Sequence, residues 1–336
     1  MGAYTFLMLD SGHTEPVSVA YLTDPGRREA NQDAVGYQIT PSGGVFIVAD
    51  GMGGHRTGEL ASKLAVDTIQ AQLRVGQPSP QQLVEAYERA NQEVYSYGQR
   101  PESRGMGTTA TTLLLDLPYA LVAHVGDSRA YLFRGGELLQ LTDDHSWVAD
   151  RMRQGLLSPE EARHHRWRNV ITNALGSFPE VKVDISALKV APGDVFLLCS
   201  DGVTSVLDDK VLLEVLKKSG PSATASELVK LANAWGGPDN ISVMVVAVGG
   251  QVPAGQRSYA LPLEGAAGPI RLSISDAPET LNAGLPGQTG EENPPGRART
   301  GDRLGLVLLL LLWLALLAYV LYNQYGQNGI PIQPFR

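Results

Sequence analysis

The sequence predicts an α+β fold in which antiparallel β-sheets are covered by helices on the outside. Short β-branched and aromatic runs come in pairs joined by Gly- or Pro-containing turns, which is typical of β-hairpins. Stretches with helical spacing also come in pairs, within residues 57–97 and 208–234. Strands and helices therefore do not alternate one by one, as they do in a parallel, doubly wound sheet.

The N-terminal part predicts a strand, a hairpin and two helices. Residues 17–23 form the strand, and a turn follows at 24–26. The hairpin joins strands at 34–39 and 45–49. The first helix spans 57–73, with apolar side chains at helical spacing at Leu60, Leu64, Ile69 and Leu73. Ser79, followed by Pro80, predicts the N-terminal cap of a second helix at about 80–97.

The middle of the chain predicts further hairpins before a second pair of helices. Residues 145–180 show helix and loop character with charged patches. Two helices are expected at 208–218 and 222–234. The strands expected here are 108–115, 119–124, 130–133, 138–141, 181–190, 195–199 and 241–248.

The 336 residues divide by composition into four parts. Residues 1–249 have the make-up of one globular domain. Residues 250–303 are rich in Pro and Gly and predict a flexible linker, in which 270–274 is the one strand-like run. Residues 304–322 contain no charge and would span about 28 Å as a helix, close to the thickness of a bilayer core. We therefore expect a transmembrane helix there rather than a buried core helix, followed by a short extracytoplasmic tail at 323–336.

Three arginines close to the predicted span indicate its orientation. Arg297, Arg299 and Arg303 precede the apolar run, whereas the tail after it carries a single positive side chain at Arg336. Because Lys and Arg favour the cytoplasmic flank, the N-terminal domain is expected to lie in the cytoplasm, anchored to the cell membrane and its lipid by one span.

Charge and cysteine content narrow the class of function. The net charge is −8 and the pI about 5.3. No basic patch stands out, so nucleic acid is not expected as a partner. The sole cysteine, Cys199, excludes intramolecular disulfides and is compatible with a reducing compartment.

Four aspartates lie at strand ends or turns, each beside Gly or Asn. Asp50 ends the run 45–49, Asp201 follows 195–200, Asp239 precedes the strand at 241, and Asp127 lies between two strands. Each alone is more often a turn residue than a ligand, but together they indicate a metal cluster. Carboxylate oxygens suit Mg²⁺ or Mn²⁺ rather than zinc.

Two such ions favour phosphoryl chemistry, because they bind phosphate oxygens and activate water. Other phosphate chemistries are excluded by spacing. A cysteine phosphatase needs an arginine where this chain has Ser205, and a P-loop needs a lysine where Glu59 follows the glycines. A phosphoaspartate enzyme needs a second aspartate two residues after the first, where this chain has Met52 and Val203.

The order of the motifs resembles that of the metal-dependent serine/threonine protein phosphatases, the PPM or type 2C family, in its bacterial form. The resemblance covers about residues 17–248 and is highly specific as a set. The matching stretches are DPG at 24–26, REANQD at 28–33, VADGMGGH at 48–55, GE at 58–59, GMGTT at 105–109, VGDSRAY at 125–131, LTDDHS at 141–146, NVITNALG at 169–176, LCSDG at 198–202 and GPDNIS at 237–242.

The resemblance implies two central antiparallel sheets flanked by helix pairs, an α-β-β-α sandwich. It also implies hydrolysis of phosphoserine and phosphothreonine at a centre of two Mn²⁺ or Mg²⁺ ions, with a possible third, weaker site. By matching positions, the implied metal ligands are Asp50 as the bridge, the carbonyl of Gly51, Asp201 and Asp239, with Asp33 acting through water and Asp127 joining Asp201 at the third site. Arg28 occupies the position of a phosphate-binding arginine.

Two residues depart from the pattern of many family members. Gln32 stands where many have Glu, and Met52 stands where eukaryotic relatives carry a histidine proposed as general acid. The partners implied are phosphorylated proteins, including a Ser/Thr protein kinase and its substrates. Two alternatives stay open at this point: an inactive phosphatase-like binding or sensor module, and a metal phosphatase that acts on small molecules.

Overall fold

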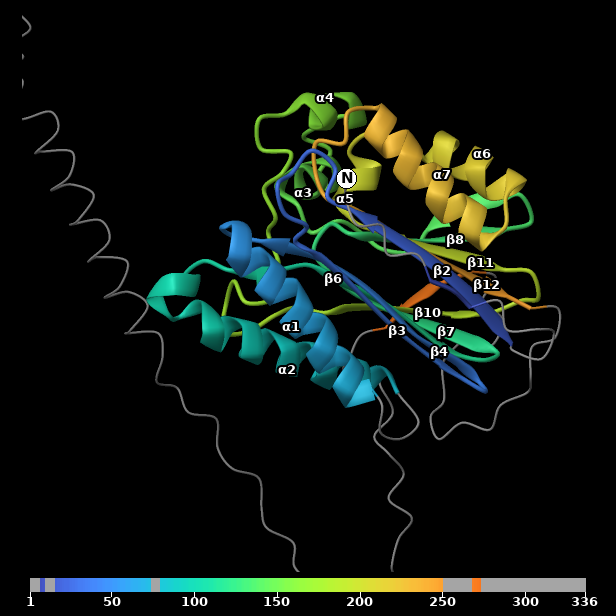
Figure 1. The fold of residues 1–336 in the computed structure, drawn as a ribbon, viewed down its shortest axis with the longest axis horizontal. Coiled ribbons are helices and arrows are strands. Elements are labelled where there is room, and N and C mark those ends of the chain that lie inside the picture. The colour runs from blue at the N-terminus through green and yellow to red at the C-terminus, as the bar shows by residue number, and fades with distance from the viewer. Residues whose placement is uncertain (1–6, 10–15, 74–78, 250–267, 273–336) are drawn as a thin grey trace, which may run out of the picture. The chain divides into compact units, whose positions relative to one another are not determined.

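Two antiparallel sheets lie face to face between two layers of helices, as Figure 1 shows. The computed structural model describes residues 7–9, 16–73, 79–249 and 268–272. All of these belong to one compact unit, residues 1–281. The architecture confirms the predicted α+β fold with its two sheets and its outer helix pairs.

The first sheet has six strands in the order β1-β2-β12-β11-β8-β9. Each neighbouring pair is antiparallel. The strands are β1 Leu7–Leu9, β2 Val17–Asp24, β8 Arg129–Arg134, β9 Glu137–Gln140, β11 Val195–Cys199 and β12 Ile241–Val248.

The second sheet has seven strands, six of them in the order β13-β10-β7-β6-β4-β3, and β5 pairs with β4. Its pairs are likewise antiparallel. The strands are β3 Asp33–Thr40, β4 Gly43–Met52, β5 Gly107–Thr108, β6 Ala110–Asp116, β7 Tyr119–Val125, β10 Asp184–Lys189 and β13 Ile270–Leu272. A cis peptide bond joins Leu117 to Pro118 in the turn from β6 to β7.

Four long helices form two outer layers, and two short helices lie in a connecting segment. Helices α1 and α2 cover the second sheet, and α6 and α7 cover the first (Figure 1). Helices α3 and α4 lie in the segment between β9 and β10. The bounds are α1 His55–Leu73, α2 Pro80–Gly98, α3 Trp147–Arg153, α4 Pro159–His164, α5 Asp201–Thr204, α6 Asp209–Lys218 and α7 Pro221–Ala234, with a 3₁₀ turn at Pro101–Ser103.

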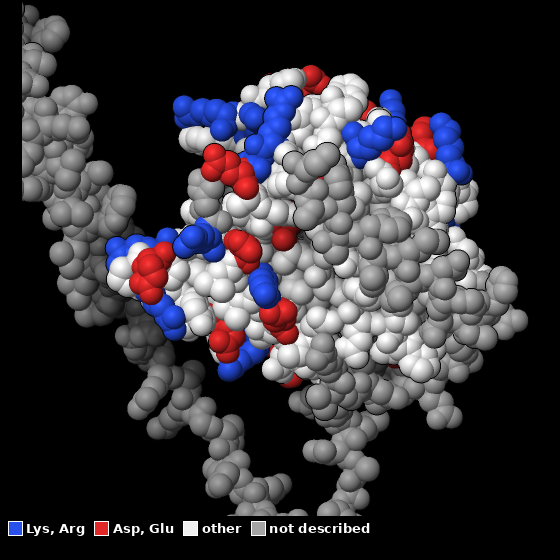
Figure 2. Space-filling view, viewed as in Figure 1, with Lys and Arg blue, Asp and Glu red and all other residues white. Residues whose placement is uncertain are grey.

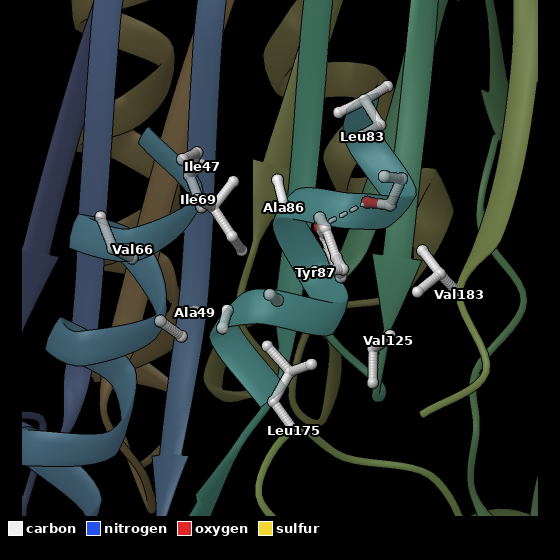
Figure 3. Close-up of a cluster of buried hydrophobic side chains, with 14 of the residues drawn as sticks. Ile47, Ala49, Val66, Ile69, Leu83, Ala86, Tyr87, Val125, Leu175 and Val183 are labelled. Atoms are coloured by element: carbon white, nitrogen blue, oxygen red, sulfur yellow. Dashed lines mark hydrogen bonds between the residues drawn. The ribbon is translucent and has the colours of Figure 1, made fainter. Parts of the chain in front are cut away.

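Strand β4 shows why the central strands are apolar on both faces. Its side chains alternate between two cores, because successive residues of a strand point to opposite faces. Val45, Ile47 and Ala49 face α1 and α2, as Figure 3 shows for the last two. Phe46 and Val48 face the other sheet, in the core between the sheets. A third core lies between the first sheet and α5, α6 and α7.

Local signals fix where the helices begin. The Ser79 side chain accepts a hydrogen bond from the Gln82 amide, and the Gln82 side chain accepts one from the Ser79 amide. This capping box confirms the predicted start of α2. Helix α7 begins one residue earlier than expected, at Pro221 with Gly220 as its cap, because proline is well suited to the first helical position.

The C-terminal predictions fall largely outside the described residues. Among the residues that the structure describes, no helix is long and apolar enough to cross a membrane. The predicted span at 304–322, the tail at 323–336 and most of the linker at 250–303 lie beyond those residues. Within the linker, Ile270–Leu272 forms β13 at the edge of the second sheet, which confirms the strand-like signal there.

Charged side chains on the surface are mixed in sign. On the face shown in Figure 2, blue and red side chains are interspersed among the described residues. Several form pairs within one helix, such as Arg89 with Glu93 on α2. Such exposed pairs contribute little to stability.

One charge pair has a buried carboxylate and lies far from the strand ends that carry the other aspartates. It allows a test of stability that is separate from the acidic cluster. Arg134 binds both carboxylate oxygens of Asp194, at 2.8 and 2.6 Å, and Asp194 is 1% exposed. Arg134→Ala is expected to lower the free energy of unfolding by about 2 kcal/mol, since a buried carboxylate loses its main donors. Denaturant titration measures this change. Arg89→Ala is the matched control, and an equal loss in both variants would contradict the argument.

Candidate metal centre

Five aspartates from both sheets meet at one end of the sandwich. Asp33 begins β3 and lies opposite Asp50 of β4 in the register of the second sheet. Asp201 follows β11 at the start of α5, and Asp239 lies two residues before β12, both at the end of the first sheet. Asp127 lies in the turn from β7 of one sheet to β8 of the other. The fold thus brings together the acidic residues that the sequence singled out.

Asp50 lies at the centre of this group. Burial raises the pKa of Asp50 well above its usual value, and the charges of Asp33, Asp201, Asp127 and Asp239 raise it further. A residue that is affected by all four of its acidic neighbours is well placed to bridge bound cations.

The pKa values of the other carboxyl groups are raised in the same way. Burial raises the pKa of Asp33 to about 7, opposed by hydrogen bonds from Ser242 and Ser200. Burial and the neighbouring Asp239 raise the pKa of Asp201 to about 6. For Asp127, burial and then the charge of Asp201 raise the pKa well above its usual value. A divalent cation would stabilise the ionised form of these carboxyl groups by supplying positive charge.

Three buried carboxylate oxygens have no hydrogen-bond partner among the described residues. They are Oδ1 of Asp33, Oδ1 of Asp127 and Oδ1 of Asp201. An unpaired buried carboxylate oxygen is costly, and native proteins satisfy almost all such atoms. These three oxygens lie in one acidic cluster, so a cation fits them better than three separate donors would.

The cluster is not a closed cage of side chains. In the described part of the chain, no three or more His, Cys, Asp or Glu side chains are arranged so that they enclose a metal ion. Mg²⁺ and Mn²⁺ do not require such a cage, since Mg²⁺ is commonly held by one or two carboxylates, waters and substrate phosphate. The donor set is all oxygen, which fits these ions and does not fit zinc.

Backbone hydrogen bonds fix the position of Asp50. The Asp50 amide donates to Oγ1 of Thr109 at 2.9 Å. The Asp50 carbonyl accepts from the Thr109 amide and from the Thr108 hydroxyl, at 2.9 and 2.8 Å. Both threonines are buried, and Thr109 also bonds to Ser128, next to Asp127. The sequence showed these threonines as part of a motif but did not reveal this role.

Asn240 links the loop before β3 to the residues before β12. Its Oδ1 accepts from the Gln32 amide, and its Nδ2 donates to the carbonyls of Pro25 and Ala30, all within 3.0 Å. The side chain is 3% exposed. Ser200 makes a second link, donating from its hydroxyl to Oδ2 of Asp33 at 2.7 Å. Together these residues set the spacing between the acidic groups of the two sheets.

Close backbone packing requires glycine beside two of the aspartates. A Cβ on Gly51 would lie 2.0 Å from the carbonyl oxygen of Gly58 in α1. A Cβ on Gly202 would lie 2.0 Å from the carbonyl oxygen of Asn240. Any side chain there would push the loops apart and move Asp50 or Asp201.

Arg28 lies at the rim of the cluster, paired with an aspartate. Its Nη2 donates to Oδ2 of Asp239 at 2.7 Å, and its Nε donates to the Pro238 carbonyl at 3.1 Å. The side chain is 52% exposed, so much of the guanidinium faces solvent. Arg28, the arginine that the resemblance assigns to phosphate binding, therefore lies beside the acidic cluster and contacts Asp239, one of the predicted ligands.

Comparison with known proteins agrees with the site. The family profile of protein phosphatase 2C matches residues 26–233. The chain is 38% identical over 240 residues to protein phosphatase PhpP of Streptococcus pneumoniae, covering 69% of this chain and 98% of that protein. It is 36% identical over 236 residues to the serine/threonine phosphatase stp of Listeria monocytogenes, covering 67% and 94%.

Solved structures show the same likeness. The serine/threonine phosphatase PstP/Ppp of Mycobacterium tuberculosis superposes with a TM-score of 0.65 at 34% identity, over 69% of this chain and 99% of that one. The catalytic domain of PstP in complex with two manganese ions superposes with a TM-score of 0.63 at 34% identity, over 69% and 98%.

Fold, acidic centre and relatives together define a metal-dependent protein serine/threonine phosphatase, a hydrolase of phosphoric monoesters. This class uses Mn²⁺ or Mg²⁺. The chain belongs to the protein phosphatase 2C family.

The carboxyl groups predict a link between pH, metal and stability. With raised pKa values, the folded protein binds protons more tightly than the unfolded chain, so these groups reduce stability as pH rises from about 4 to about 7. Mn²⁺ binds the ionised carboxylates, so its stabilisation is expected to be larger at pH 8 than at pH 5. Thermal unfolding with EDTA or Mn²⁺ at both pH values measures this, with K⁺ at equal ionic strength as control. An equal rise in Tm at both pH values would contradict the assignment.

Proposed function

We propose that this phosphatase works through a two-ion centre held by the aspartates at the end of the sandwich. Asp50 would bridge the ions, Asp201 and Asp239 would bind one of them, and the Gly51 carbonyl would complete a site. Asp33 would act through water, and Asp127 with Asp201 would hold a third, weaker ion. The observation that carries the proposal is the convergence of buried aspartates with three unpaired carboxylate oxygens.

The role of the protein is to hold this arrangement rigid. When bound, Mn²⁺ or Mg²⁺ supplies positive charge for the phosphoryl group and activates water for attack. The bonds to Thr109, Ser200 and Asn240 keep the carboxylates at fixed spacing, so little reorganisation is needed during the reaction. Arg28 would orient the phosphate of a substrate, because a guanidinium can donate two hydrogen bonds to phosphate oxygens.

The substrates that we propose are phosphoserine and phosphothreonine proteins at the inner face of the cell membrane. The uncharged run at 304–322 and the arginines before it support a single C-terminal span with a cytoplasmic catalytic domain. Anchored in this way to membrane lipid, the domain would meet membrane proteins, including a Ser/Thr protein kinase and its targets. The relatives named above as protein phosphatases support a protein substrate.

Neutral variants of the ligands test the two-ion centre. Asp50→Asn and Asp239→Asn are each expected to lower kcat/KM for a phosphothreonine peptide by more than about 100-fold at saturating Mn²⁺, because each removes a charged ligand of similar shape. Since the ions act together, the double variant is expected to be little worse than either single variant.

A matched control separates catalysis from stability. Asp67→Asn removes an exposed aspartate from α1 and should keep the wild-type rate. Circular dichroism shows whether each variant is folded. Wild-type kcat/KM in a folded Asp50→Asn variant would show that Asp50 is not a ligand.

The predicted orientation can be tested on intact cells. Protease added from outside is expected to leave residues 1–249 intact, because the domain lies behind the membrane in the proposed topology. Protease added after permeabilisation should cut the chain within residues 250–303. Immunoblotting with an antibody to the catalytic domain measures both. Digestion of the domain in intact cells would reverse the topology and exclude cytoplasmic substrates.

A further inference from the structure

A short segment beyond the family match is bound to the catalytic domain. The profile match ends at residue 233, whereas β13 begins at Ile270. Strand β13 pairs antiparallel with β10 over three positions, at Ile185–Leu272, Ser186–Arg271 and Ala187–Ile270. Without β13, β10 would be an edge strand of the second sheet.

The side chains of β13 add specificity to this backbone pairing. Ile270 and Leu272 are half-buried and pack against the core between the second sheet and α1 and α2. Between them, Arg271 is exposed and its Nη2 binds Oδ2 of Asp143. The alternation of apolar and charged side chains is what an added edge strand requires, with one face on the core and one in solvent.

Asp143 connects this strand to α3. Nη1 of Arg153, the last residue of α3, lies 4.0 Å from the same Oδ2 of Asp143. Arg153 also pairs with Asp150 at 2.5 Å and donates to the Asp144 carbonyl at 3.3 Å. The Asp143 carboxylate is therefore shared between an arginine of the linker strand and an arginine of α3.

The residues that follow Asp143 contact the turn that carries Asp127 of the acidic cluster. Asp144 binds Arg129 through both carboxylate oxygens, at 2.8 and 2.7 Å. The His145 amide donates to the Gly126 carbonyl at 2.7 Å, and its ring accepts from the Gly126 amide at 3.1 Å. The turn that these residues hold carries Asp127. A continuous set of contacts thus runs from β13 to α3 and to the acidic cluster.

We propose that residues 268–272 are a docking strand in cis, which fastens the linker to β10 and couples it through Arg271 and Asp143 to α3. Release of the strand would remove Arg271 from Asp143, so that Arg153 would be the remaining arginine beside this carboxylate. The local charge at the end of α3 would therefore change. The effect on substrate binding rests on the proposed function, because it requires a phosphopeptide bound at the acidic cluster to extend over α3. The docking itself does not depend on that function.

Hydrogen exchange on the full chain tests the docking. In a variant with Ile270→Asp and Leu272→Asp, the amides within 185–187 that face β13 are expected to exchange about tenfold faster or more than in the wild type, because β10 loses one of its two partner strands while its pairing with β7 remains. Arg257→Ala changes another linker residue and serves as control. Equal exchange in all three proteins would overturn the proposal. Protection that falls on dilution would also overturn it, since a second copy would then supply the strand.

A double-variant cycle tests the coupling. Arg271→Ala and Asp143→Asn are each expected to change amide exchange in 147–153. The double variant is expected to match Asp143→Asn alone, because that change already removes the contact with Arg271 together with the one to Arg153. Additive effects would mean that the two residues act separately and would overturn the coupling.

Two substrates test the consequence for catalysis. Arg271→Ala is expected to change KM for a phosphothreonine peptide by about threefold, roughly the loss of one exposed charge contact. The kcat for p-nitrophenyl phosphate should not change, because this small substrate lacks the peptide side chains that are proposed to contact α3. An unchanged peptide KM would overturn the coupling. An inactive wild-type protein would instead contradict the proposed function and leave the exchange results to decide the docking.

Discussion

Mutual repulsion among buried carboxylates is the constraint on which the active end of this protein depends. Burial and neighbouring charges act in the same direction, so Asp50 and Asp127 both have strongly raised pKa values. Such a cluster would push itself apart in a loosely held structure. It persists because the surrounding backbone is tied down by bonds from Thr109, Ser200 and Asn240. The fold thus holds several buried carboxyl groups close together at one end of the sandwich, where a bound cation would stabilise them.

The acidic residues could be found from the sequence because each lies at the end of a strong strand signal. Asp50 follows a continuous apolar run, and Asp239 precedes another. The residues that position them could not be found in this way. Asn240 bonds to Pro25 and Ala30, more than 200 positions away in the chain. Only the antiparallel pairing of β2 with β12 brings those positions together, and no local pattern encodes that distance.

Element type was easier to predict than element boundaries. The paired strands and the paired helices were recognisable because their apolar periodicities are long. The expected strand at 181–190 is shorter in the structure, at Asp184–Lys189, where it pairs with β7. Segment 145–180 contains two short helices, α3 and α4, whose lengths give no clear period. The three residues of β13 gave only a faint signal, because their pairing partner decides their structure.

The position of the acidic cluster across two sheets has a consequence for the interior. Asp33 and Asp50 belong to the second sheet, whereas Asp201 and Asp239 adjoin strands of the first. The distance between these pairs is therefore set by the side chains that separate the sheets, among them the fully buried Phe46 and Phe196. Protein interiors are close-packed and transmit small changes in volume. The two phenylalanines therefore help to set the distance between the aspartates of the first sheet and those of the second. A change in their volume would alter the geometry of the acidic cluster from within the hydrophobic core.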